Sequence, residues 1–161
     1  MGDEARQALD EKHCLKMLEH LPVAVLIAEV SGRPLYMNRS ARNLLGMGLQ
    51  DLDLEAGIGD LAKVFCAHVA GTNQLYPRER SPLAKALAGE ISTVDDMEIR
   101  QQGQTIPLEV SASPIFDEKG EVAFAIAVFK DIADRKKEER DLSQRRNELE
   151  RLIAKARAGR R

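Results

Sequence analysis

Apolar residues recur along the chain in the short runs and strict alternations that are typical of β-strands. Residues 23–28 and 35–37 are two apolar runs on either side of a glycine-containing turn, which predicts a hairpin. Residues 93–100 and 105–113 alternate apolar with polar positions, so each is predicted to be a strand with one solvated face. Residues 122–129 are apolar throughout, which predicts a central strand covered on both faces.

Other segments carry helix formers with apolar positions at helical spacing. We expect a leading helix, a helix of one or two turns, a helical stretch in mid-chain, a two-turn helix and a long terminal helix. In that order they cover residues 5–20, 40–45, 61–69, 81–89 and everything from 132 onward. The remainder of the mid-chain region is predicted to be loops and short helices.

The residues at two of these helix ends support their assignment. The side-chain oxygen of Asn38 is placed to cap the helix at 40–45, which Gly46 or Gly48 is expected to end. Ser81 is a suitable N-cap for the next short helix, a proline follows it at the first helical position, and Gly89 lies where the chain leaves that helix. Both segments are therefore predicted to be compact helices.

The order of these elements predicts an α+β fold, an antiparallel five-stranded sheet with helices on one face. A chain of 161 residues is long enough for one core. We divide it into a leading helix at 1–20, a central domain at 21–131 and a terminal helix at 132–161. This division predicts one folded body with a helix at each end.

Composition supports a globular protein and excludes several classes. Hydrophobic residues make up 43% and charged residues 31%, and no apolar run approaches the roughly 20 residues of a membrane helix. The first residues are acidic and polar where a secretory signal would be basic and then apolar, so the expected location is cytoplasmic. Cys14 and Cys66 are then most simply two reduced thiols.

Four segments of the sequence together resemble the PAS family. Residues 21–25 lead into the first predicted strand, and residues 36–41 follow the second. Residues 106–114 form the fourth strand, and residues 129–136 lead out of the fifth. The last resembles the Asp-Ile-Thr-Glu-Arg-Lys exit of PAS domains that feed a signalling helix, with Ala133 in place of Thr and Asp134 in place of Glu. The resemblance implies a PAS fold over most of the chain.

The family resemblance also implies an arrangement and a role. The sheet would have the order 2-1-5-4-3, with a ligand pocket between it and the helices. Asp131, Ile132 and Arg135 would relay a signal from the domain through the terminal helix to an effector such as a histidine kinase or a nucleotide cyclase domain, in the same or another chain. The protein would be a sensory and dimerisation module.

The predicted pocket is mostly apolar, which favours a small apolar ligand or simply a packed core. Its expected lining residues are Val25, Ile27, Leu44, Phe65, Leu83, Leu87, Leu108 and Val110.

No resident cofactor is predicted, and haem and FAD are kept as alternatives. The chain has Gly71-Thr72-Asn73-Gln74-Leu75-Tyr76 where a flavin-cysteinyl photosensor would carry its reactive cysteine, which excludes that photochemistry. The residues 81–89 hold no histidine for the best-known type of haem sensor, which leaves His68 on the preceding helical stretch as the candidate haem ligand. A zinc site at Cys66 and His68 is not supported, because residues two apart on a helix point in different directions and no second spaced pair accompanies them. A thioester on Cys66 is not expected either.

Catalytic machinery is not expected. The three histidines accompany no recognisable triad signature, and the glycines between residues 46 and 59 lack the lysine of a phosphate-binding loop. The protein is therefore predicted not to be an enzyme.

The terminal helix is predicted to be a parallel two-stranded coiled coil. Leu142, Leu149 and Ala156 recur every seven residues, and Arg146 and Ile153 occupy the alternate seam position. The apolar strand at 122–129 also needs a cover on the face turned away from the core, for which we propose the leading helix of the same or a partner subunit. The homodimer would therefore use Leu15, Leu18, Leu142, Leu149 and Ile153.

The charge of the tail raises a competing function. Residues 131–161 hold eleven Lys or Arg and seven Asp or Glu, a balance of +4, whereas the other 130 residues carry a balance of -6. This basic tail could contact nucleic-acid phosphates, but Glu148 and Glu150 interrupt it and no aromatic residue is interleaved for base stacking. A solvated coiled-coil face is the preferred interpretation.

Overall fold

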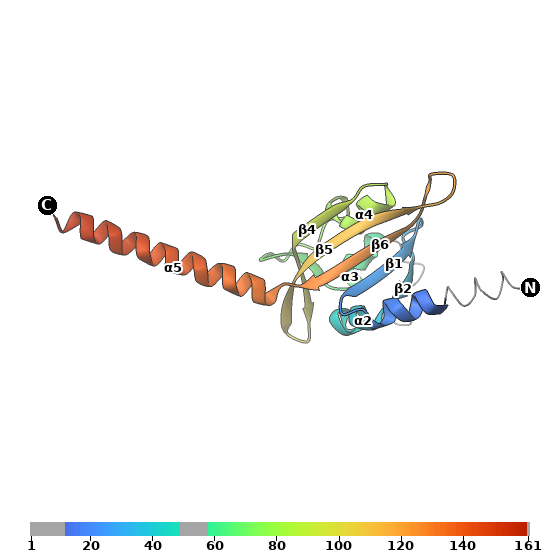
Figure 1. Ribbon diagram of the computed structural model, residues 1–161, viewed down its shortest axis with the longest axis horizontal. Helices are drawn as coiled ribbons and strands as arrows, with labels where there is room; N and C mark the ends of the chain where they lie inside the picture. Colours follow the sequence, from blue (N-terminus) through green and yellow to red (C-terminus); the bar gives the residue numbers. More distant parts are fainter. Residues whose placement is uncertain (1–11, 49–57, 161) are drawn as a thin grey trace, which may run out of the picture. The chain divides into compact units, whose positions relative to one another are not determined.

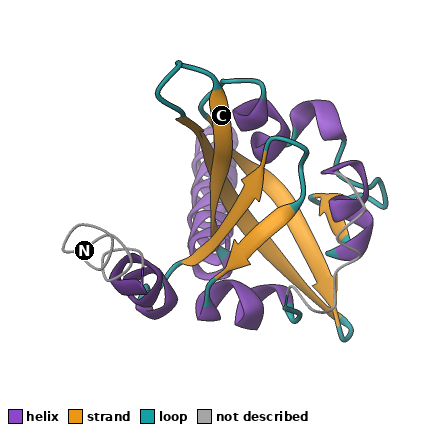
Figure 2. Ribbon diagram, turned by 90° about the vertical axis from the view of Figure 1, so that its right-hand side faces the viewer, coloured by secondary structure: helices purple, strands orange, loops and turns teal. Residues whose placement is uncertain are grey.

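The computed structural model describes residues 12–48 and 58–160, and it confirms an α+β fold built on one antiparallel sheet (Figure 1). Within those residues the sheet has six strands in the order β2-β1-β6-β5-β4-β3, and its twist is plain in Figure 2. The strands are β1 (Ala24–Glu29), β2 (Pro34–Met37), β3 (Ala67–Val69), β4 (Ser92–Gln101), β5 (Gln104–Phe116) and β6 (Val122–Asp131).

Residues 12–20 form the described part of the leading helix. The other helices are α2 (Arg39–Leu45), α3 (Ile58–Val64), the 3-10 turn η2 (Arg78–Arg80), α4 (Pro82–Leu87) and α5 (Ala133–Ala158). The start of the predicted leading helix and the predicted loop at 49–57 lie outside the described residues.

The predicted strand order holds, with one strand added at the edge. The third, fourth and fifth predicted strands are β4, β5 and β6, and β3 extends the sheet beyond β4. The prediction of a helix over 61–69 was wrong at its end, because α3 stops at Val64 and Cys66 adopts a left-handed φ of 49°. The next three residues pair with Met97–Ile99 of β4. A short apolar run does not by its spacing distinguish a strand from a helix.

The predicted caps are confirmed in one helix and corrected in the other. The Oδ1 atom of Asn38 accepts a hydrogen bond from the amide of Ala41, and Gly46 ends α2 at a φ of 72°. A Cβ atom at Gly46 would also lie 2.7 Å from the side chain of Gln101, so glycine fits here for two reasons. Ser81 precedes the proline of α4 as predicted, but its hydroxyl makes no capping hydrogen bond.

The two faces of the central strands differ in side-chain size. On the inner face, Ala125 and Ala127 of β6 lie beside Ala24, Leu26 and Ala28 of β1, and all five are buried in the core. The four alanines leave room between the sheet and the helices α2, α3 and α4. The core of the fold is therefore on this inner face.

The outer face carries the larger residues. Ile126 pairs with Ile27 of β1, and Phe124 pairs with Ile115 of β5. The central position of β6 is confirmed, but Phe124 is 40% exposed and Ile115 41% exposed. The leading helix meets this side at its edge, where the Tyr36 hydroxyl reaches the carbonyl of Leu15.

The body, residues 1–131, and the terminal segment, residues 132–161, are separate compact units. In the terminal unit, α5 runs for 26 residues, about 39 Å at 1.5 Å per residue. All of its side chains are at least partly exposed, including the predicted seam residues Leu142, Leu149 and Ile153. None of the helices in the described ranges is long and apolar enough to cross a membrane.

Candidate ligand cavity

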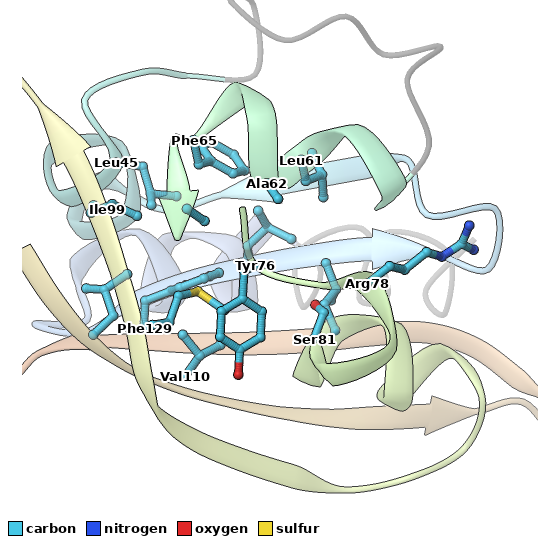
Figure 3. Close-up of a pocket in the computed structure, with 15 residues that line it drawn as sticks. Leu45, Leu61, Ala62, Phe65, Tyr76, Arg78, Ser81, Ile99, Val110 and Phe129 are labelled. Atoms are coloured by element: carbon cyan, nitrogen blue, oxygen red, sulfur yellow. The ribbon is translucent and has the colours of Figure 1, made fainter. Parts of the chain in front are cut away.

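A cavity of about 70 Å³ lies between the inner face of the sheet and the short helices (Figure 3). The sheet contributes Leu26 from β1, Ala67 from β3, Met97 and Ile99 from β4, Leu108 and Val110 from β5, and Phe129 from β6. The helices and the segments between them contribute Leu45, Leu61, Ala62, Phe65, Tyr76, Arg78, Ser81 and Leu83. The wall is therefore almost entirely apolar.

Four of the eight residues expected at this pocket line the cavity, namely Phe65, Leu83, Leu108 and Val110. Leu44 and Leu87 pack against the core without reaching the cavity wall.

The other two expected lining residues, Val25 and Ile27, lie on the opposite face of β1, and Leu26 between them faces the cavity. Strand side chains alternate between faces, so a shift of one residue exchanges the two faces.

The sequence reasoning missed several wall residues. Met97 and Ile99 could have been predicted as wall residues, because their alternation with Glu98 and Arg100 places them on one face of the strand. Tyr76 and Leu45 carried no comparable signal. Tyr76 reaches the cavity through the isolated pairing of the segment after β3, where its amide donates to the carbonyl of Ala67 at 2.9 Å.

Tyr76 is the most buried of the polar residues in the wall, and a carboxylate holds its hydroxyl. Its hydroxyl donates to Oδ1 of Asp96 at 2.7 Å, and the guanidinium of Arg80 forms an ion pair with the same carboxylate. Arg80 also lies over the Tyr76 ring, 5.3 Å from its centroid. Burial, and then the hydrogen bond to Asp96, raise the pKa of Tyr76, so the phenol is neutral at physiological pH.

The backbone of β4 explains how Asp96 reaches this position. The pairing of β4 with β5 shifts register between Val94 and Met97, which is a local irregularity of the bulge kind. Such an irregularity redirects the side chains within it. Asp96 thus turns toward Tyr76 and Arg80, although simple alternation from Met97 and Ile99 would not place it there.

The cavity does not fit either cofactor that the sequence left open. Pockets for drug-sized ligands measure roughly 300–1,000 Å³, several times the 70 Å³ found here. None of the lining residues is a cysteine or a histidine. The cavity as it stands therefore has too little space for an isoalloxazine or a haem, and its wall carries neither of the two side chains, histidine and cysteine, that most often ligate haem iron.

His68 and Cys66 lie away from the cavity wall. His68 is on β3, not on a helix as the sequence analysis expected, and its neighbour Ala67 faces the cavity. Its ring Nδ1 lies 2.8 Å from the carbonyl oxygen of Cys66, whose thiol is exposed. In the described ranges, no group of three or more histidine, cysteine or acidic side chains is arranged to hold a metal ion.

A buried asparagine ties the leading helix to the body. The Asn38 amide donates to the carbonyls of Leu18 and Val23 at 2.9 and 2.8 Å, and its oxygen accepts from the amides of Val25 and Ala41. Every hydrogen-bonding group of this fully buried side chain is therefore used. Sequence reasoning recognised the cap to Ala41 but not the three other bonds.

A second tie is ionic. Arg42 forms an ion pair with Glu19 of the leading helix, and the Tyr36 hydroxyl donates to the same carboxylate at 3.0 Å. The hydrogen bond from Arg42 is the main cause that lowers the pKa of Glu19. Burial, and then Glu19 itself, raise the pKa of Tyr36 to about 12. The leading helix is thus attached at the edge of the sheet by polar contacts.

The expected relay residues lie where the sheet ends. Asp131 is the last residue of β6 and pairs with Leu108, which lines the cavity. Ile132 is buried at 3% exposure and occupies the N-cap position of α5, and Arg135 lies in the first turn of that helix. A single strand therefore connects the cavity wall at Phe129 to the beginning of α5.

Comparison with known proteins now gives this fold a family. A scan of protein families matches the PAS fold over residues 18–137, which is most of the chain. The chain belongs to the PAS family. PAS domains act as sensory modules, usually without catalysis of their own. The comparison with curated proteins gave no match.

Solved PAS structures share this fold at low sequence identity. The PAS domain of nitrogen regulation protein NR(II) from Vibrio parahaemolyticus is 20% identical with a TM-score of 0.52, over 73% of this chain and 96% of that one. The PAS domain of Bordetella pertussis BvgS is 20% identical with a TM-score of 0.53, over 86% and 98%. An RNA-binding light-oxygen-voltage receptor is 21% identical with a TM-score of 0.63, over 90% of this chain and 39% of the receptor.

Proposed function

We propose that this PAS domain senses a small ligand in its cavity and passes the resulting change through β6 and α5 to an effector domain such as a histidine kinase or a nucleotide cyclase. The observation that carries the proposal is the course of β6. Phe129 forms part of the cavity wall, and three residues later the chain enters α5 through the buried Ile132. A change in the cavity has a short covalent path to the helix.

The apolar wall supports binding of a small ligand. An apolar cavity gains free energy when an apolar group replaces poorly bonded water, and about 70 Å³ is enough for a small group. A ligand shifts the state of the domain only if it binds one state more tightly than the other. Tyr76 is well placed to differ between states, because its ring is in the wall and its hydroxyl is bonded at the rim.

We propose that the protein acts as a homodimer through α5, assisted by Leu15 and Leu18 of the leading helix and the outer face of the sheet. The seam residues Leu142 and Leu149 are 66% and 60% exposed, and Ile153 is 51% exposed, in the single chain. In a parallel coiled coil with Leu142 at position d, Arg145 at g would face Glu150 at e of the partner helix. That opposite-charge pair favours the parallel arrangement.

The nucleic-acid alternative rests on the exposed cations of α5, among them Arg145, Arg146 and Arg151. Glu148 and Glu150 are exposed between them, which reduces the attraction for a phosphate backbone. Binding of a short RNA that weakens steeply with salt in a mobility-shift assay would favour this alternative over the coiled coil.

A cavity-filling substitution tests the relay. Ala62 of α3 lines the cavity, and Ala62→Leu adds bulk there, whereas Ala88→Leu adds the same bulk at an exposed position after α4. We expect Ala62→Leu to change hydrogen exchange in the first turns of α5 and the dimer dissociation constant, and Ala88→Leu to change neither. If both variants fold and α5 responds to neither, the cavity is only a core void and the proposed relay is wrong.

A further inference from the structure

The cavity mouth holds two polar groups that have no partner among the described residues. Of the residues that line the cavity, only Tyr76, Arg78 and Ser81 have polar side chains. The hydroxyl of Tyr76 is already bonded to Asp96. By contrast, no hydrogen bond or ion pair from the described part of the chain reaches the guanidinium of Arg78 or the hydroxyl of Ser81.

The positions of Arg78 and Ser81 indicate how a ligand would be oriented. Arg78 and Ser81 come from one short segment, η2 and the residue before α4. Figure 3 shows Ser81 near the backbone end of the Arg78 side chain, whose guanidinium points away from the apolar wall. A molecule bound here would have its apolar part among the leucines and its polar end at this segment.

We propose that the ligand is a short-chain aliphatic carboxylate, with its hydrocarbon tail in the cavity and its carboxylate at the mouth against Arg78 and Ser81. This assignment rests on the proposed function and adds the chemical class of the ligand. A carboxylate matches the two parallel N–H donors of a guanidinium, and the serine hydroxyl donates a further hydrogen bond.

The charges around the mouth are consistent with an anionic head group. Arg78 is the only charged residue among those that line the cavity. The nearby carboxylate of Asp96 is neutralised by its ion pair with Arg80, and Glu79 is exposed and does not line the cavity. Burying an ionised head group inside an apolar wall would be strongly unfavourable, so the carboxylate belongs at the rim, where water still reaches it.

The cavity volume limits the length of the tail. Each methylene that enters the cavity should tighten binding by about fourfold. A space of about 70 Å³ is filled by a few carbon atoms, so this gain should stop once the tail outgrows it. We therefore expect affinity to rise from butyrate to hexanoate and to level off or fall at octanoate.

Titrations of the full chain with these acids, followed by methyl NMR shifts of Leu26, Leu45 and Leu83, test the proposal. 1-Hexanol at the same ionic strength serves as the uncharged counterpart of hexanoate. Arg78→Met removes the charge and keeps an apolar stem, and we expect it to weaken hexanoate binding about tenfold while leaving 1-hexanol unchanged. Arg39→Met, at an exposed arginine of α2 that does not line the cavity, is the matched control.

Three results would overturn the assignment. If 1-hexanol binds as tightly as hexanoate, or if Arg78→Met leaves hexanoate binding unchanged, the carboxylate head group is wrong while ligand sensing in the cavity still stands. If neither the acids nor 1-hexanol shift the cavity methyl groups at millimolar concentration, the proposal of a carboxylate ligand is wrong. The proposed ligand sensing is then also wrong if Ala62→Leu leaves hydrogen exchange in α5 unchanged.

Discussion

The two faces of strands β1 and β6 are both apolar, yet they differ in side-chain size and in exposure. The inner face holds Leu26 among alanines, all buried against the helices, with the partly buried Phe129 at its end. The outer face holds Ile27, Ile126 and Phe124; Val25 at one end of it is buried, but Phe124 is 40% exposed. Small side chains allow helices to approach a sheet closely, whereas large exposed ones form a surface that another element or subunit would cover. The inner face is thus packed around a cavity, and the outer face is the one that we propose for association.

Among the variants that test this contrast, we expect the largest change in stability from truncating neighbouring residues on β1. Leu26→Ala removes a fully buried side chain and enlarges the cavity, so we expect it to lower the free energy of unfolding by about 2–5 kcal/mol. Ile27→Ala, on the partly exposed outer face, should lower it by about 1 kcal/mol. Urea unfolding of both variants measures the difference. Equal losses would mean that the outer face is as closely packed as the core.

Changes in the α5 seam should act on association and not on the fold of the body. We expect Leu142→Arg with Leu149→Arg to shift the protein toward monomer at micromolar concentration, because like charges would meet in the seam. Gln144→Arg with Asn147→Arg adds the same charge away from the seam and should leave the dimer intact. Light scattering measures the particle mass. A double seam variant with the parent's dimer would show that α5 is not the dimerisation element.

A charge on the outer face should have a smaller effect. Phe124→Lys is expected to change the free energy of unfolding by no more than about 1 kcal/mol, because the residue is already partly exposed, but to raise the dimer dissociation constant. Val30→Lys, at a 55% exposed position after β1, is the control and should leave association unchanged. Analytical ultracentrifugation compares the two. An equal dimer constant for both variants would remove the outer face from the interface.

The attachment of the leading helix should depend weakly on pH. The lowered pKa of Glu19 means that its contribution is present above the unfolded value of about 4.3 and is lost as the pH falls through the folded value. The raised pKa of Tyr36, about 12, means that its contribution is present below about 10 and is lost as the pH rises through 12.

Hydrogen exchange of residues 12–20 should therefore be slowest, relative to the intrinsic rate, between about pH 5 and 10. Glu19→Gln should remove the acid limb of this dependence. If the parent protein and the variant show the same exchange across the acid range, the Arg42 contact does not hold the helix.

The fold was largely predictable because its elements are marked by alternation and by helix-end residues. Asn38, Gly46 and the alternation of Met97 with Glu98 each act locally, and the sequence records such local effects directly. β3 was not predictable in this way, because only its pairing with β4 makes Ala67–Val69 a strand. The face of β1 was misjudged for a related reason, since three consecutive apolar residues are compatible with either face.

The site was only half predictable. Phe65, Leu83, Leu108 and Val110 lie on elements whose inward faces the sequence indicates, and they line the cavity. Tyr76 and its bond to Asp96 depend on an irregularity in β4 and on the path of a loop, which no local pattern encodes. Long-range contacts of this kind decide which side chains meet.

Xenon binding followed by NMR tests the link between cavity and helix most directly. Xenon enters apolar cavities without any polar contact, so it probes the space by itself. Under xenon pressure we predict shifts of the methyl groups of Leu26, Leu45 and Leu83, together with proportional shifts of the α5 amides from Ala133 to Arg140. Cavity methyl groups that shift and saturate while those amides remain unchanged would contradict a sensory role for this cavity.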